Sequence, residues 1–252
     1  MRSAAPAHAP GAVRLLALDT ATERMAVAVV DGHVQYCAEE VGAALASQRL
    51  LPLIFEMLAR AGLTLASLDA IVFGRGPGAF TGLRTACSVA QGLAFGAGLP
   101  VLAIDSLAIV AEDARAQHGP AAERLWVAMD ARMDAVYAAA YRAVDGDWQL
   151  EQAPALWAVE SLAQAWLAGQ GEPPVCVAGS ALEAFGARLP TGAALRVPQT
   201  KDRAAALARL ARSAWQRGEG VDAALALPLY LRDKVASTTA EREADALAKS
   251  LA

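Results

Sequence analysis

Histidine and cysteine, which build most metal sites and many nucleophilic sites, are scarce in this sequence. The 252 residues include three of each, and no histidine is paired at metal-ligand spacing with a histidine, a cysteine or two carboxylates. The sequence also lacks a GxSxG motif, a cysteine with a convincing histidine partner and a lysine set in an apolar segment. It therefore predicts no metal site and no catalytic nucleophile.

Basic charge and unbroken apolar segments are also lacking. The net charge is −4, so we expect no broad basic surface and no binding of nucleic acid without a partner's charge. The uncharged run from Thr85 to Ile104 is interrupted by Gly96, Gly98 and Pro100, which predicts a helix and a strand rather than a membrane span. The flexible leader expected at residues 1–12 has no signal-peptide core, and the three separated cysteines indicate buried thiols of a reducing compartment. Together these features predict a cytoplasmic protein.

The segment from Ile71 to Gln91 carries the strongest local pattern, an apolar strand followed by a glycine-rich loop and a helix. Glycine is favoured where φ is positive or where another group approaches the main chain, and the loop contains Gly74, Gly76, Gly78 and Gly82. With Thr81 as the cap, the first free amides of the helix would form an anion cradle. Arg75 and Arg84 would then meet a phosphate or an acidic partner. The alternative is a tight turn with two solvated arginines.

Two better-known glycine motifs compete with this interpretation. A Walker A motif is excluded because no lysine follows Gly82. A dinucleotide fingerprint is harder to exclude, since Gly74, Gly76 and Ala79 fit GxGxx[GA] after a strand and Asp105 ends the next apolar run. Asp105 lies later than that fingerprint expects, and the helical pattern begins after Gly82 rather than inside the fingerprint. An NAD-dependent dehydrogenase stays open as an alternative.

Two segments of similar design predict an internal duplication. Residues 15–32 form an apolar strand ending at Asp19, a short turn and a second strand, and residues 126–146 repeat this design with the first strand ending at Asp130. A third strand and a helix from Ser180 follow. Two related lobes with a cleft between them are the expected result, with coincidence in an alanine-rich chain as the alternative. For Asp130 we favour a role in closing the turn.

Two amphipathic helices complete the expected elements. Residues 47–62 have a core-facing apolar stripe and a second stripe of Leu51 and Phe55 beside Ser47 and Gln48, which indicates a contact surface for another chain or a helix buried on two sides. Pro52 is tolerable there only if the first turn is short or bent. Residues 200–218 predict a helix capped by Thr200 or Asp202 and ended by Gly218. Residues 236–252 predict a loose tail.

Five motifs together resemble one family over about residues 13–235. They are LALDTAT (16–22), SQRLLP (47–52), FGRGPGAFTGLR (73–84), AMDARMDAVY (128–137) and PLYLR (228–232). This combination is similar to the TsaB family, also called YeaZ. The resemblance implies an α/β, actin-like fold of the sugar-kinase and Hsp70 type, with lobe I formed by residues 13–106 plus 206–235 and lobe II by 107–205. It also implies a role in threonylcarbamoyl modification of adenosine 37 in ANN-decoding tRNAs.

In that family the protein is not the catalyst, so the resemblance implies a scaffold. It would pair through lobe I with the paralogue TsaD, on which the ATPase TsaE acts, and would form a homodimer when alone. No tightly bound cofactor is expected, although ATP or ADP can approach the partner junction, and tRNA would be met only through the complex. Ala46, where the family often has histidine, and Asp134, where glycine is usual, depart from the pattern. A small-molecule kinase of the same fold is the main alternative.

The residue patterns and the resemblance together give two sets of candidate site residues. The dimer interface would include Ser47, Gln48, Leu51 and Phe55. Contacts to nucleotide or partner would come from Asp19, Thr20, Gly74, Arg75, Gly76, Pro77, Gly78, Thr81, Gly82 and Arg84.

Overall fold

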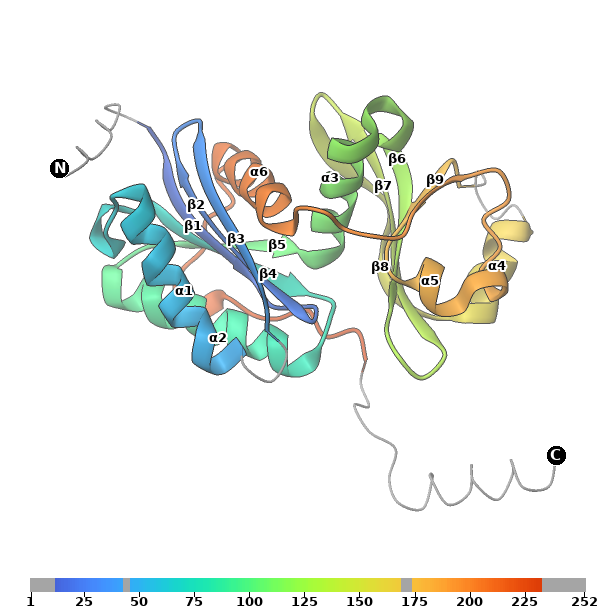
Figure 1. The fold of residues 1–252 in the computed structure, drawn as a ribbon, viewed down its shortest axis with the longest axis horizontal. Helices are drawn as coiled ribbons and strands as arrows, with labels where there is room; N and C mark the ends of the chain where they lie inside the picture. The colour runs from blue at the N-terminus through green and yellow to red at the C-terminus, as the bar shows by residue number, and fades with distance from the viewer. Residues whose placement is uncertain (1–11, 43–45, 169–173, 233–252) are drawn as a thin grey trace, which may run out of the picture.

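The computed structural model describes residues 12–42, 46–168 and 174–232, which form two mixed β-sheets covered by helices (Figure 1). The first sheet has the strand order β3-β2-β1-β4-β5. Its strands are β1 (Arg14–Asp19), β2 (Arg24–Asp31), β3 (Val34–Val41), β4 (Ala70–Gly76) and β5 (Val101–Asp105). β2 is antiparallel to β1 and β3, whereas β1, β4 and β5 are parallel. The leader, apart from Ala12, and the tail lie outside the described residues.

The second sheet repeats the first strand for strand. Its order is β10-β9-β6-β7-β8, with β7 antiparallel to both neighbours and β6, β9 and β10 parallel. The strands are β6 (Arg124–Asp130), β7 (Ala135–Val144), β8 (Asp147–Ala158), β9 (Cys176–Ala178) and β10 (Leu195–Val197). β6 therefore corresponds to β1 and β9 to β4, which confirms the predicted duplication as a repeated topology. We call the two halves lobe I and lobe II, each named for its sheet.

Helices cover both faces of each sheet. One helix on each sheet follows, in the chain, a strand of the other sheet. α1 (Ala46–Ala61) and α2 (Phe80–Ala97) cover one face of the first sheet, while α6 (Arg203–Gln216), which follows β10, covers the other. α3 (Ser106–His118) follows β5 but packs on the second sheet, opposite α4 (Val159–Leu167) and α5 (Ala181–Phe185). α3 and α6 contact each other between the lobes (Figure 1). Short 3-10 helices span Leu65–Ser67, Gly119–Ala122, Gly186–Arg188 and Ala223–Leu225.

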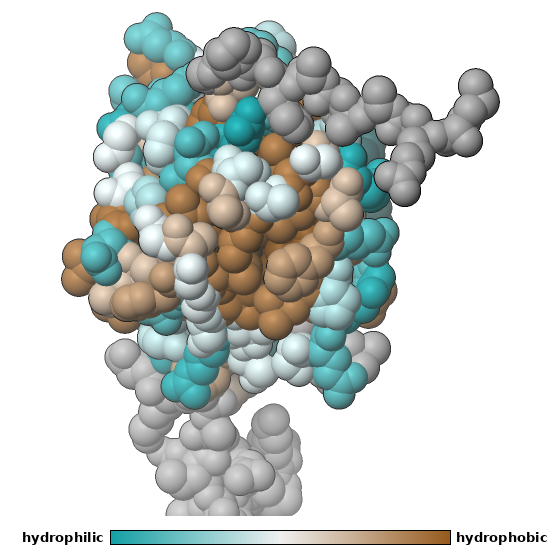
Figure 2. All heavy atoms as spheres, turned by 90° about the vertical axis from the view of Figure 1, so that its left-hand side faces the viewer, coloured by the Kyte–Doolittle hydropathy of each residue, from teal (hydrophilic) through white to brown (hydrophobic). Residues whose placement is uncertain are grey.

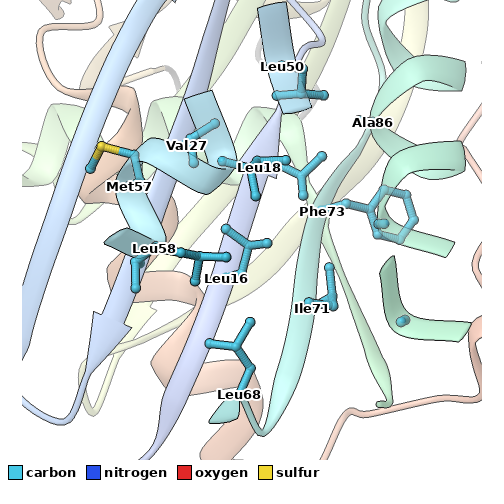
Figure 3. Close-up of a cluster of buried hydrophobic side chains, with 14 of the residues drawn as sticks. Leu16, Leu18, Val27, Leu50, Met57, Leu58, Leu68, Ile71, Phe73 and Ala86 are labelled. Atoms are coloured by element: carbon cyan, nitrogen blue, oxygen red, sulfur yellow. The ribbon is translucent and has the colours of Figure 1, made fainter. Parts of the chain in front are cut away.

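Alternation along the strands divides lobe I into two cores. Leu16 and Leu18 of β1 point to the α1 and α2 side, whereas Leu15 and Ala17 point to α6. Figure 3 shows Leu50, Met57 and Leu58 of α1 packed over Leu16, Leu18, Ile71 and Phe73 of the sheet. The core-facing stripe predicted for α1 is confirmed, because Leu50, Leu53, Ile54, Met57, Leu58 and Ala61 are all buried.

The structure confirms one predicted helix cap and corrects another. α6 begins after Asp202, whose carboxylate accepts a hydrogen bond from the amide of Ala205 at 2.9 Å. α2 begins at Phe80 with Ala79 as its cap residue, so Thr81 lies inside the first turn and does not cap the helix. The helix thus opens before Gly82 but still after Ala79, the last position of the dinucleotide fingerprint, so its starting point argues against that fingerprint. The sheet topology argues against it as well, since β2, an interior strand, is antiparallel to both of its neighbours. Pro52 also lies within α1 rather than in its first turn.

Candidate functional site

Two adjacent parallel strands of lobe I, β1 and β4, bring the predicted loop residues together. β1 ends at Asp19, and β4 continues through Gly76 into the glycine loop and α2. Because the carboxyl ends of parallel strands meet at one edge of a sheet, the turn after β1 and the loop after β4 lie against each other. This edge therefore holds the predicted residues Asp19, Thr20, Gly74, Arg75, Gly76, Pro77, Gly78, Thr81, Gly82 and Arg84.

The loop glycines are required mainly by the chain's own turn. A Cβ on Gly74 would lie 1.7 Å from Oδ2 of Asp19, and one on Gly82 would lie 1.9 Å from the carbonyl oxygen of Thr20. A Cβ on Gly78 would lie 2.5 Å from the carbonyl oxygen of Ala21. Gly76 has a φ of +108° instead. Close approach at three positions and positive φ at the fourth thus explain the four glycines without any ligand.

Several polar groups of the loop are already bonded within the protein. The hydroxyl of Thr20 donates to the carbonyl oxygen of Gly82 at 2.6 Å, and the amide of Ala79 donates to the carbonyl oxygen of Ala21 at 2.8 Å. The amide of Gly76 donates to Oγ of Ser106 at 3.1 Å. These bonds fix the loop as a tight turn against β1. An anion cradle at the first amides of α2 stays a prediction.

Asp19 is fully buried, and both of its carboxylate oxygens are engaged. Oδ1 accepts hydrogen bonds from Nε of Arg203 at 2.9 Å and from the amide of Ala21 at 3.1 Å. Oδ2 accepts from the hydroxyl of Ser106 at 2.7 Å. Arg203 is itself buried, and its guanidinium also donates to the carbonyl oxygen of Ser106 at 3.3 Å. An internal cation therefore neutralises Asp19, and two side chains and one amide satisfy it.

The two loop arginines have partners within lobe I and the C-terminal segment. Nε of Arg75 donates to Oδ1 of Asp105 at 2.5 Å, which also engages the carboxylate that a dinucleotide fingerprint would use for ribose. The guanidinium carbon of Arg84 lies 3.8 Å from the centre of the Phe80 ring, and Nε donates to the hydroxyl of Tyr230 at 3.1 Å. Arg84 follows the first helical turn rather than lying in it. Contact of either arginine with phosphate or an acidic partner stays a prediction.

A cleft of about 780 Å³ opens between the lobes beside this loop. Residues 21–24 and 77–80 form its lobe I wall, residues 129–133 belong to its lobe II wall, and residues 229–232 of the C-terminal segment line it as well. Arg203 lies at the cleft, but its charge is paired with Asp19. The predicted cleft between the lobes is therefore present, lined largely by apolar groups.

The turn after β6 confirms the interpretation of Asp130 as a turn residue. Oδ1 of Asp130 accepts a hydrogen bond from the amide of Arg132 at 2.8 Å. Arg132, Met133 and Asp134 have φ values of 62°, 55° and 52°, a left-handed conformation that costs roughly 1–2 kcal/mol per residue without glycine. The Asp134 carboxylate pairs with Arg188 at 2.7 Å. The turn therefore adopts a left-handed conformation with aspartate, not glycine, at position 134.

The second apolar stripe of α1 is exposed, which excludes the alternative of a helix buried on two sides. Leu51 is 40% exposed and Phe55 53%, and Ser47 and Gln48 are exposed beside them. Phe95 on α2 is 68% exposed. Figure 2 shows the molecule from the left-hand side of Figure 1, where α1 and α2 end. Hydrophobic residues gather across the middle of this side. We call Leu51 and Phe55 the helix face.

Sequence reasoning missed the residues that complete the site. Ser106 and Arg203 contact Asp19 from the first positions of α3 and α6, and Tyr230 and Arg232 line the cleft from the C-terminal segment. Tyr230 and Arg232 lie within the PLYLR motif, so that motif was a usable signal. Arg203 had none, because an arginine beside a helix cap ordinarily indicates solvent exposure.

Two of the three cysteines are buried as the sequence predicts, whereas Cys37 on the edge strand β3 is only half-buried. Cys87 and Cys176 are buried, and burial raises the pKa of the Cys176 thiol from 9.0 to about 11. Across the described ranges no helix is long and apolar enough to cross a membrane. Within the same ranges, no group of three histidine, cysteine or acidic residues is placed to hold a metal ion.

Two lobes with the same sheet order, joined by exchanged helices around a cleft, define this chain as an actin-like protein. The sequence profile described as "TsaD: tRNA N6-adenosine threonylcarbamoyltransferase" matches residues 40–240. The structure of YeaZ from Pseudomonas aeruginosa is similar with a TM-score of 0.76 and 42% identity, over 87% of this chain and 100% of that chain. The chain belongs to the TsaB (YeaZ) family.

Curated relatives carry the same family name over shorter segments. The tRNA threonylcarbamoyladenosine biosynthesis protein TsaB of Escherichia coli K12 is 40% identical over 57% of this chain and 62% of its own length. The protein of that name from Haemophilus influenzae is 47% identical over 49% of this chain and 51% of its own length. The chain thus spans between half and two thirds of these relatives in the matched segments.

Proposed function

We propose that this chain is a non-catalytic subunit required for threonylcarbamoyl modification of adenosine 37 in ANN-decoding tRNAs. The names of the curated relatives support the pathway, since both are tRNA threonylcarbamoyladenosine biosynthesis proteins. The chain acts as a heterodimer with a TsaD paralogue and together with the ATPase TsaE. It supplies shape and contact surface, and its partner supplies the chemistry.

The hydrogen bonds and the ion pair of Asp19 support the proposal that this chain is not the catalyst. A carboxylate that binds Mg²⁺ or activates an acceptor must offer an oxygen to the metal or the substrate. Both oxygens of Asp19 are bonded inside the protein, and Arg203 already supplies the compensating charge. Asp130 of lobe II is bonded to its own turn. The strand-end carboxylates of the two lobes are therefore committed to structure.

The helix face supports the partner role. Leu51 and Phe55 remain exposed on α1 although the rest of its apolar stripe is buried. An apolar surface of this kind is typical of a site that another protein covers. The TsaD paralogue covers it in the heterodimer, and a second copy of the chain covers it when the chain is alone. The net charge of −4 supports contact with tRNA through the complex rather than through this chain.

Reconstitution with omission of single components tests the proposal. The purified chain is mixed with TsaD and TsaE of the same organism, ATP, threonylcarbamoyl-adenylate and unmodified tRNA, and the modified nucleoside is measured. We expect product with all components and a loss of product without this chain. A Leu51→Glu, Phe55→Glu variant should behave like the omission, whereas Leu150→Glu, an equally exposed site on lobe II, should support modification. Full modification without the chain refutes the proposal.

The interlobe cleft favours one alternative, an ATP-dependent small-molecule kinase. Its volume of about 780 Å³ is sufficient for a nucleotide-sized ligand. The kinase predicts ATP turnover by the isolated chain, whereas the scaffold does not. ADP release measured on the isolated chain separates the two, and a dehydrogenase would instead show binding of a nicotinamide cofactor.

A further inference from the structure

Within the described residues the chain passes between the lobes at two places, and each passage brings one side chain to the same buried carboxylate. The first leads from β5 of lobe I into α3, which packs on lobe II, and Ser106 is the first residue of α3. The second leads from β10 of lobe II into α6, which packs on lobe I, and Arg203 is the first residue of α6. Ser106 and Arg203 both bond to Asp19 at the end of β1.

These bonds are buried and mutually dependent. Asp19 is 0% exposed, Ser106 1% and Arg203 3%. Ser106 accepts from the amide of Gly76 while it donates to Asp19, so the group also joins β1 to β4. Moving Arg203 away from Asp19 would leave a buried charge without its partner, which is far more costly than breaking a solvated pair. Moving Ser106 away would leave the buried Oδ2 of Asp19 without its hydrogen bond. Rotation of the lobes about these passages is opposed for that reason.

We propose that Asp19, Ser106 and Arg203 form a lock that holds the two lobes in one relative orientation without a bound ligand. The cation that neutralises the strand-end carboxylate is part of the chain, so the interlobe junction is complete in the free protein. The lock does not depend on the proposed role in tRNA modification. It follows from the connection of three buried side chains to both passages.

Neighbouring contacts also hold the second passage, the segment between β10 and α6. The buried carboxylate of Asp113 on α3 accepts from the amides of Lys201 at 3.0 Å and of Asp202 at 2.9 Å. Nε of Arg209 on α6 donates to Glu112 on α3 at 2.5 Å. The segment that precedes Arg203 is therefore held from the α3 side, while Arg203 is held from the β1 side.

Contacts at the mouth of the cleft act in the same direction. Arg132 of lobe II pairs with Glu23 of lobe I at 2.9 Å. Arg232 of the C-terminal segment donates to the carbonyl oxygens of Ala131 and Arg132 at 3.1 and 3.2 Å. The Arg132 and Glu23 side chains are largely exposed, so their pair contributes little alone. The buried lock at the base carries the effect.

Interlobe distances in the full chain test the lock. Spin labels attached to p-acetylphenylalanine at exposed positions Ser88 on α2 and Ser161 on α4 report the distance between lobes without using the native cysteines. The variants are Arg203→Met and Asp19→Asn with Arg203→Met, which removes both charges and keeps an amide for Ser106. Leu16→Ala is the control, because it weakens the lobe I core without touching the lock.

We expect one narrow distance distribution for the wild type and for Leu16→Ala, and a broader or shifted one for the double variant. Hydrogen exchange in residues 103–108 and 199–206 should accelerate by about tenfold or more in the double variant relative to β7, which lies outside the lock. If Arg203→Met alone is too unstable to purify, the double variant decides. Wild-type distances and wild-type hinge exchange in the folded double variant would overturn the proposal.

Discussion

Replacing Leu51 and Phe55 by glutamate should convert a dimer of this chain into a folded monomer. Both side chains point away from the core on α1, so the substitution removes apolar surface without opening a cavity. The charged side chains would remain solvated in the monomer. In a dimer built on the helix face they would have to lose water without a partner, and association should fail for that reason.

The exposed fractions set the size of the effect. Complete burial of such a side chain contributes about 1.5–3 kcal/mol. With 40% of Leu51 and 53% of Phe55 still exposed, the remaining contributions are about 0.6–1.2 and 0.8–1.6 kcal/mol. In a symmetric dimer each side chain is buried twice, which gives about 3–6 kcal/mol, or a factor of about 10² to 10⁴ in Kd.

Sedimentation equilibrium of the full chain measures this Kd, and circular dichroism melts show whether each variant is folded. Leu150→Glu is the matched control, because Leu150 is 52% exposed on β8 of lobe II. We expect wild-type association for the control and a loss of at least about a hundredfold for the double variant. A folded double variant that associates like the wild type would place the contact elsewhere and refute the reasoning.

Four further outcomes follow from the structure. Gly82→Ala should lower stability by roughly 1–3 kcal/mol, because its Cβ would lie 1.9 Å from the carbonyl oxygen of Thr20. Arg84→Ala should cost no more than about 1 kcal/mol, the size of an exposed cation–π contact, and equal losses in urea titrations would contradict this difference. The isolated chain should hydrolyse ATP far more slowly than about one turnover per second. Hydrolysis at about that rate by the wild type, together with its loss in Asp19→Asn, would contradict this prediction. Because the folded pKa of Cys176 is raised from 9.0 to about 11, its contribution to stability is complete below pH 9 and is lost as pH rises through 11. Denaturant titrations from pH 8 to 11 should show a smaller decline for Cys176→Ala than for the wild type, and equal declines would exclude this thiol as a cause.

The sequence predicted those elements whose pattern is local. The two hairpins alternate clearly, and α1 and α6 have apolar residues at helical spacing, so each was found with nearly its observed bounds. β3 gave no comparable signal, because as an edge strand it is half-buried along most of its length. β8 is likewise exposed over much of its length. Thr81 was expected to cap α2 because it is a good capping residue, yet the helix begins one residue before it without a side-chain cap.

The site residues likewise divide into those that a local sequence pattern reveals and those that only the fold brings together. Asp19 and the four glycines could be located because they lie at a strand end and in one short loop. Arg203 could not, because it meets Asp19 across 184 positions of the chain and no periodicity links them. The exposure of Leu51 and Phe55 was indicated by the second stripe of α1, although only the structure could separate an exposed stripe from one covered by another part of the same chain.

The exchange of α3 and α6 has a consequence for synthesis of the protein on the ribosome. All strands of lobe I have been made by Asp105, but the helix that covers one face of this sheet ends only at Gln216. At translation rates of about 5–20 residues per second, roughly a hundred residues separate these events by about 5–20 s. During this interval Leu15, Val72 and Leu102 lack the helix that buries them. The nascent first lobe is therefore a natural client for a chaperone until its last helix emerges.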